Sequence, residues 1–297
     1  MIRTPLSTTS VLDEAAEVVS LTASPWAALL MATALPYRFL QALFIDQLIE
    51  VHDSASSYGN LLGATANVIV ITIVIALAGR AIYARACRLA AARGTAPGRE
   101  AWRIRPAALA CYILTASVTM LVGYVSLFTI VGYPIAVIFA GLAVGTVEMN
   151  ERVSVTRPFA HIFRHAKTVA IPVALTMVFF CALFVALANL AAAASLATWL
   201  ASAIGGFDAP NWQVLFSPGN RRYVLLLFAG ALMIVEPFWI AANVIYVRKA
   251  GAEESGDDLR AWFDELRSDE LRSDELRSDE LRSDELRAGE ELKEVPA

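Results

Sequence analysis

Residues 106–147 read PAALACYILTASVTMLVGYVSLFTIVGYPIAVIFAGLAVGTV and carry no charged side chain. About 20 apolar residues of α-helix cross the roughly 30 Å core of a bilayer, whereas one helix over these 42 residues would be about 63 Å long. The stretch must therefore fold back once. We expect the turn between Ser126 and Pro134, because Gly132 and Pro134 are helix breakers. Since a bilayer core holds no water to bind backbone groups, both halves are predicted to be helical.

Four other stretches are nearly as apolar, and 57% of all residues are hydrophobic, more than in an ordinary soluble domain. We therefore predict an all-α, polytopic integral membrane bundle of about six transmembrane helices. The predicted spans are residues 25–45, 61–82, 106–126, 129–148, 169–190 and 223–247.

The apolar pattern of the fifth predicted span continues to Gly205, too far for one crossing. We interpret residues 194–204 as a separate interfacial helix with Trp199 at the depth of the lipid headgroups. The alternative is a seventh, short or re-entrant segment.

Basic residues are distributed unevenly between the two sides of the predicted bundle. The loops on one side hold 14 Lys and Arg residues, and the opposite loops hold only Arg221 and Arg222. Basic residues favour the cytoplasmic side of a membrane, so both termini are predicted to be cytoplasmic. The 14 residues are Arg3, Arg80, Arg85, Arg88, Arg93, Arg99, Arg103, Arg105, Arg152, Arg157, Arg164, Lys167, Arg248 and Lys249.

The segment before the first span has the pattern of an amphipathic helix. Ser10 followed by Asp13 resembles a capping box, with Ser10 as the N-cap. Apolar residues then share one helical face, and we predict that this helix lies along the cytoplasmic surface. They are Val11, Leu12, Ala15, Val18 and Val19.

The C-terminal part is acidic and repetitive. From Ala252 onward the sequence contains 17 Asp and Glu residues but only 7 Lys and Arg residues. Leu259, Trp262, Phe263 and Leu266 have helical spacing, which predicts a short amphipathic helix. Asp-Glu-Leu-Arg then occurs five times, and a period of five residues spreads its leucines around a helix rather than along one seam. The tail is either an acidic docking arm or a tolerated repeat expansion that contacts nothing, and we favour the second.

These patterns divide the chain into four predicted parts. Residues 1–24 form the N-terminal segment, and residues 25–250 form the six-span bundle. Residues 251–267 form the short cytoplasmic helix, and residues 268–297 form the acidic tail of SDELR repeats.

One acidic residue, Glu236, lies deep within a predicted span and is followed by Pro237. A carboxylate inside a membrane is costly and therefore marks a candidate functional site. Its predicted partner is Arg38, which follows Pro36 in the first span. The pair is either a proton or substrate relay or a structural clamp beside proline-freed carbonyl groups, and we favour the clamp.

Other motifs favour structure over chemistry. His161 and His165 share a helical face but lack the glutamate of the zinc-protease pattern and a third ligand, so we expect a basic surface near lipid headgroups. Gly141 and Gly145 form a GxxxG pattern, which normally permits close helix packing. We interpret Cys87, Cys111 and Cys181 as small core residues. The sequence therefore predicts no enzyme activity, no catalytic residue, no metal, no cofactor and no nucleic-acid partner.

Two segments resemble a known group of proteins. They are EMNERVSVTRPFAHIFRHAKTVAIPVAL, from Glu148, and residues 236–259, with Pro237, the Tyr246-Val-Arg248 motif, Gly256 and Asp258-Leu259. Over residues 100–258 the chain is similar to uncharacterised bacterial membrane proteins that resemble the membrane domain attached to some glycerophosphodiester phosphodiesterases. Here residues 250–255 separate the basic pair from Gly256, and the catalytic phosphodiesterase domain is absent. The resemblance implies a six-span bundle of the bacterial inner membrane without the phosphodiesterase activity.

The function expected from these observations is a non-enzymatic membrane scaffold or accessory subunit of a cell-envelope complex. Membrane lipids, and another membrane or envelope protein, are its expected partners. The alternative is a transporter or lipid-handling protein that uses the Arg38 and Glu236 pair.

Overall fold

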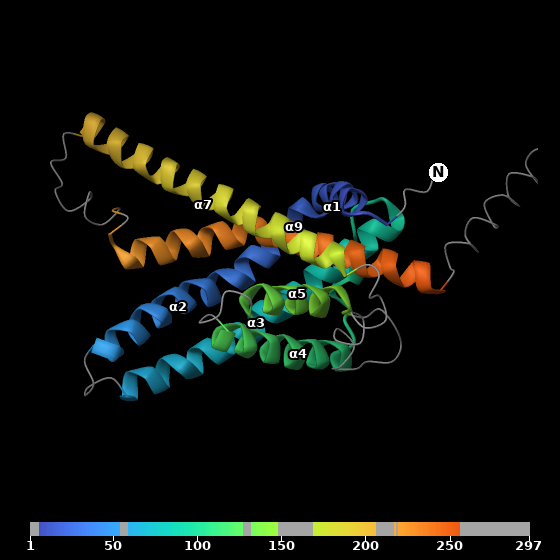
Figure 1. Ribbon diagram of the computed structural model, residues 1–297, viewed down its shortest axis with the longest axis horizontal. Helices are drawn as coiled ribbons and strands as arrows, with labels where there is room; N and C mark the ends of the chain where they lie inside the picture. Colours follow the sequence, from blue (N-terminus) through green and yellow to red (C-terminus); the bar gives the residue numbers. More distant parts are fainter. Residues whose placement is uncertain are drawn as a thin grey trace, which may run out of the picture. The chain divides into compact units, whose positions relative to one another are not determined.

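The computed structural model describes residues 6–53, 59–126, 132–147, 169–205, 217 and 219–255. The chain divides into two compact units, residues 1–248 and 249–297. The elements are α1 (Thr8–Thr22), the π-turn η1 (Ala23–Ala27), α2 (Ala28–Asp53), α3 (Gly59–Arg93), the 3₁₀ turn η2 (Arg99–Trp102), α4 (Pro106–Ser126), α5 (Gly132–Gly145), α7 (Ala170–Gly205) and α9 (Arg221–Ser255) (Figure 1). No strand occurs in the described residues, so the all-α prediction is confirmed for them.

Each of the six predicted spans overlaps a helix, but fewer helices satisfy the length and apolarity of a membrane span. Val70–Arg93, Ala170–Ile204 and Arg221–Ala252 satisfy both. Helix α1 and the segment Ala23–Leu40, bent by 91° relative to each other, count as a fourth candidate if they form one span. Helices α4 and α5 are shorter apolar helices. The described residues therefore contain three to four candidate membrane spans, and the number six stays a prediction.

The fold-back of the long apolar stretch falls where it was expected. Helix α4 ends at Ser126 and α5 begins at Gly132. Pro134 lies in the first turn of α5, where its missing N–H removes no helical hydrogen bond. The two helices pack against each other as consecutive neighbours (Figure 1).

The predicted separate helix at 194–204 is wrong. Helix α7 continues without interruption from Ala170 to Gly205. Between Val173 and Ile204 the sequence contains neither Gly nor Pro, and it is rich in alanine, the strongest helix former. A boundary near residue 190 therefore has no local cause.

The N-terminal helix exists, but its cap lies three residues earlier than predicted. Ser7 is the N-cap, and its side-chain oxygen accepts a hydrogen bond from the backbone N–H of Ser10 at 3.2 Å. The Ser10 hydroxyl oxygen accepts in return from the backbone N–H of Ser7, so Ser10 is the third helical residue rather than the cap. The helix buries Val11, Ala15 and Val18 on one face.

The GxxxG pattern of α5 marks its close approach to α9. A Cβ atom added to Gly145 would lie 2.7 Å from the backbone oxygen of Asn243 and 2.8 Å from a methyl carbon of Val247. A Cβ atom at Gly141 would overlap the Asn243 amide. The packing interpretation of Gly141 and Gly145 is therefore confirmed.

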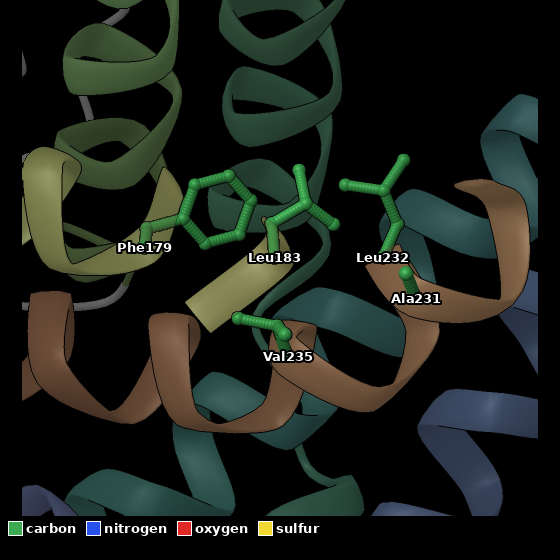
Figure 2. Close-up of a cluster of buried hydrophobic side chains, with 5 residues drawn as sticks. All are labelled: Phe179, Leu183, Ala231, Leu232 and Val235. Carbon is green, nitrogen blue, oxygen red and sulfur yellow. The ribbon is translucent and has the colours of Figure 1, made fainter. Parts of the chain in front are cut away.

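Helices α7 and α9 pack through a small apolar cluster. Phe179 and Leu183 of α7 meet Ala231, Leu232 and Val235 of α9 (Figure 2).

Elsewhere the helices expose large apolar side chains, which would be costly in water but suit lipid contact. Those with more than half of their surface exposed include Leu35, Val70, Ile71, Leu114, Leu121, Met177 and Phe184.

The three cysteines occupy different environments. Cys87 is buried, Cys111 is intermediate and Cys181 is exposed. The core prediction thus holds for Cys87 and is wrong for Cys181, which lies on the lipid-suited face of α7. The predictions for His161, His165, the 259–266 helix and the repeat tail concern residues outside the described ranges.

Candidate functional site

The structure brings Glu236 together with its predicted partner, Arg38, and with a second arginine, Arg80, that was not predicted. One carboxylate oxygen of Glu236, Oε2, accepts a hydrogen bond from a terminal nitrogen of Arg38 at 3.2 Å. The other, Oε1, accepts from Nε of Arg80. We call Arg38, Arg80 and Glu236 the charge cluster. It joins three helices, α2, α3 and α9.

Local sequence features position the three side chains. Pro36 lies inside α2 two residues before Arg38, and Pro237 lies inside α9 directly after Glu236. Proline removes a helical hydrogen bond and frees a carbonyl group, so polar side chains are tolerated nearby. Gly79 precedes Arg80 and has no room for a side chain because Thr33 of α2 fills that space. A small residue at this crossing lets α3 approach α2 closely enough for both arginines to reach one carboxylate.

Tyrosines from three helices surround the charge cluster. The ring of Tyr37 lies 5.4 Å from the Arg38 guanidinium carbon, within the range of a cation–π contact. Tyr112 of α4 lies near Arg80 and Glu236, and Tyr133 of α5 lies near Arg38. The cluster and its aromatic neighbours therefore come from five helices, α2, α3, α4, α5 and α9.

The charge cluster is enclosed. The side chains of Glu236, Arg80 and Arg38 have exposed fractions of 4%, 9% and 11%. Two guanidinium groups share one carboxylate, so the three side chains carry a net charge of about +1 if all are ionised. Removing one partner of a buried ion pair leaves a buried charge without compensation, which is strongly destabilising. The arrangement makes the fold depend on Glu236.

A count of basic residues alone predicts that Arg80 lies in a basic loop. It lies inside α3, thirteen residues before the end of that helix at Arg93. The signal in the sequence was the absence of Gly or Pro between Gly79 and Gly94, which predicts a helix running well beyond Arg80. The prediction of a loop position is therefore wrong for Arg80, and also for Arg85, Arg88 and Arg93, which lie in the same helix.

Several other arginines also bind the protein itself. Arg88 donates to the backbone oxygen of Gly145, the last residue of α5, at 2.7 Å. Arg248 donates to the backbone oxygen of Ala91 at 2.6 Å and to the Glu14 carboxylate at 3.2 Å. Cations at helix C-termini satisfy unpaired carbonyl groups and favour the helix dipole. These side chains serve as helix caps, whatever their effect on topology.

Comparisons of this chain with protein-family models, curated proteins and solved structures found no match. Within the described ranges, no group of three or more His, Cys, Asp or Glu residues could hold a metal ion. The fold and the site together define a helical protein with several apolar helices that could cross a membrane and a buried Arg–Glu–Arg cluster.

Proposed function

We propose that this protein is a non-enzymatic scaffold or accessory subunit of a cell-envelope complex. It crosses a bacterial inner membrane six times, with both termini in the cytoplasm. The observation that carries the proposal is the enclosure of the charge cluster. A carboxylate held between two arginines and packed among tyrosines ties helices together, as a structural clamp does.

The resemblance of residues 100–258 to bacterial six-span proteins supports the same proposal. The helix caps made by Arg88 and Arg248 support it as well, because each places a positive charge where it stabilises a helix end. A stable bundle with a large lipid-suited surface is a suitable platform for another membrane or envelope protein.

Affinity purification from native membranes tests the scaffold role. We expect the tagged protein to retain another membrane or envelope protein at a fixed ratio in several mild detergents. Quantitative mass spectrometry of the eluate measures that ratio, with an unrelated tagged membrane protein as the control. Recovery of a solitary monomer in every detergent would overturn the proposal.

The topology is tested by reporter fusions. Fusions after Gly94, Thr156 and Gly256 are expected to score as cytoplasmic, and fusions near Ser57 and Asp208 as external. The physical reason is the concentration of Lys and Arg residues on one side of the predicted spans. A cytoplasmic score at Asp208 would contradict six spans, because it requires one span fewer or one span more before α9.

A transporter or lipid-handling protein is the second candidate. It is favoured by the excess of two guanidinium groups over one carboxylate, which suits an anionic substrate. A pathway connecting Glu236 to one side of the membrane would have to open, because its side chain is 4% exposed. Uptake of a charged substrate into proteoliposomes, lost in a Glu236→Asp variant that remains folded, would favour this candidate over the scaffold.

A further inference from the structure

The connection between α3 and α4, residues 94–105, and the end of α3 before it are rich in arginine. Between residues 81 and 105 the sequence has six arginines and a single acidic residue, Glu100. Arg93 already pairs with the Glu100 carboxylate. Hydrogen bonds from the backbone N–H of Glu100 and from Arg93 lower the pKa of that carboxylate, so it is ionised and compensates one positive charge only. Arg85 and Arg105, in addition, repel each other.

The basic side chains of the connection point outward together with one aromatic residue. Arg99, Arg103 and Arg105 are exposed, and Trp102 between them has 54% of its surface exposed. We call these four residues the Arg–Trp patch. Tryptophan is enriched where the hydrocarbon core of a membrane meets the headgroups, because its ring is apolar and its N–H is polar.

The backbone of the connection is held firmly against the helical bundle. The buried indole N–H of Trp26 donates to the backbone oxygen of Pro97 at 3.2 Å. The rings of Trp26 and Trp102 lie 5.8 Å apart, and Ala101 is fully buried. The connection is therefore fixed to the protein through Pro97, Ala101 and part of the Trp102 ring, and the rest of Trp102 stays exposed beside the three arginines.

The position of the connection along the chain places it at a membrane boundary. The candidate span Val70–Arg93 ends immediately before it, and the apolar helix α4 begins at Pro106 immediately after it. In the proposed six-span topology, on which this inference rests, the twelve-residue segment between these two crossings lies at the depth of the phospholipid headgroups.

We propose that the Arg–Trp patch binds the headgroups of anionic phospholipids. The guanidinium groups of Arg99, Arg103 and Arg105 bind lipid phosphates, and the Trp102 ring inserts beside them. Each basic side chain near an anionic membrane surface strengthens the attraction about fivefold. An acidic protein would match the charge, but it would give no reason for an exposed tryptophan between two apolar helix ends.

Tryptophan quenching in reconstituted bilayers tests the proposal. The full-length protein is placed in bilayers containing phosphatidylglycerol or phosphatidylcholine spin-labelled near the top of one acyl chain, at equal mole fraction. The chain has six tryptophans, so the signal of Trp102 is the difference between the wild type and Trp102→Phe. We expect labelled phosphatidylglycerol to quench Trp102 more strongly than labelled phosphatidylcholine, and added salt to reduce the difference.

Variants then assign the preference to the patch. The measured preference is the stronger quenching of Trp102 by labelled phosphatidylglycerol than by labelled phosphatidylcholine. The double variant Arg99→Gln with Arg103→Gln should lose most of this preference. The double variant Arg99→Lys with Arg103→Lys should keep most of it, because Lys retains the charge. The matched control is Arg221→Gln with Arg222→Gln, two exposed arginines at the start of α9, which should leave the preference unchanged. Equal quenching by both lipids in the wild type would overturn the proposal without any variant. A preference that survives the Arg99 and Arg103 neutralisation, or that falls equally in the control, would also overturn it.

Discussion

Replacing Glu236 with glutamine is expected to destabilise the folded protein by about 3–5 kcal/mol, the cost of removing one partner from a buried ion pair. The substitution keeps the size of the side chain but leaves Arg38 and Arg80 in a nearly dry environment without their shared carboxylate. The free energy of unfolding in detergent, or the loss of folded protein on heating, measures the effect.

Two further variants show whether the loss comes from uncompensated charge. Glu100→Gln removes the carboxylate from the exposed pair with Arg93 and should change stability little, because exposed ion pairs contribute little. Adding Arg80→Gln to Glu236→Gln removes one of the two uncompensated charges, so the double variant should recover part of the lost stability. A Glu236→Gln protein as stable as the wild type would show that the cluster does not hold the helices together. A double variant less stable than the single variant would show that charge is not the cause.

The sequence predicted the helices better than it predicted their ends and contacts. The length of an apolar stretch depends only on local composition, and the predicted span 106–126 matches α4. The fold-back lies where Gly132 and Pro134 indicated. The end of a helix depends on weaker signals. Bilayer thickness alone predicts a boundary near residue 190 of α7, although nothing in the sequence breaks the helix there.

Of the charge cluster, the sequence predicted Glu236 and Arg38 but not Arg80, because local sequence patterns carry no information on contacts between helices. A lone acidic residue in an apolar span needs a cation, and Arg38 was the basic residue assigned to a span interior. Arg80 was missed because its role depends on lateral packing, namely the crossing of α3 and α2 at Gly79 and Thr33. No single-helix pattern contains that information.

The arginines of the predicted cytoplasmic side illustrate the same limit. A charge count treats them as equivalent, but the structure divides them by what they contact. Arg80 belongs to the charge cluster, and Arg88 and Arg248 cap helices. Arg99 and Arg103 remain exposed beside Trp102. We therefore expect that substitutions of different arginines will affect topology, stability and lipid binding separately.

Substituting alanine at Gly145 is expected to destabilise the protein, whereas the same substitution at Gly230 is not. Alanine in place of glycine stabilises a helix interior by about 0.5–1 kcal/mol when nothing obstructs the new methyl group. Gly230 of α9 comes near this case, because the new methyl group would meet only the flexible end of Leu190 at 3.3 Å, which has to shift slightly. We expect Gly230→Ala to be neutral or slightly stabilising, as measured by unfolding in detergent.

At Gly145 the same methyl group would lie 2.7 Å from the backbone oxygen of Asn243. A backbone atom cannot move aside without displacing α9, so Gly145→Ala should destabilise the protein by about 1–3 kcal/mol, the usual cost of overpacking. Displacing α5 would also strain the hydrogen bond from Arg88 to the Gly145 carbonyl. If Gly145→Ala proved as harmless as Gly230→Ala, α5 and α9 would have to lie farther apart than this contact allows. The GxxxG spacing would then have no packing role in this bundle.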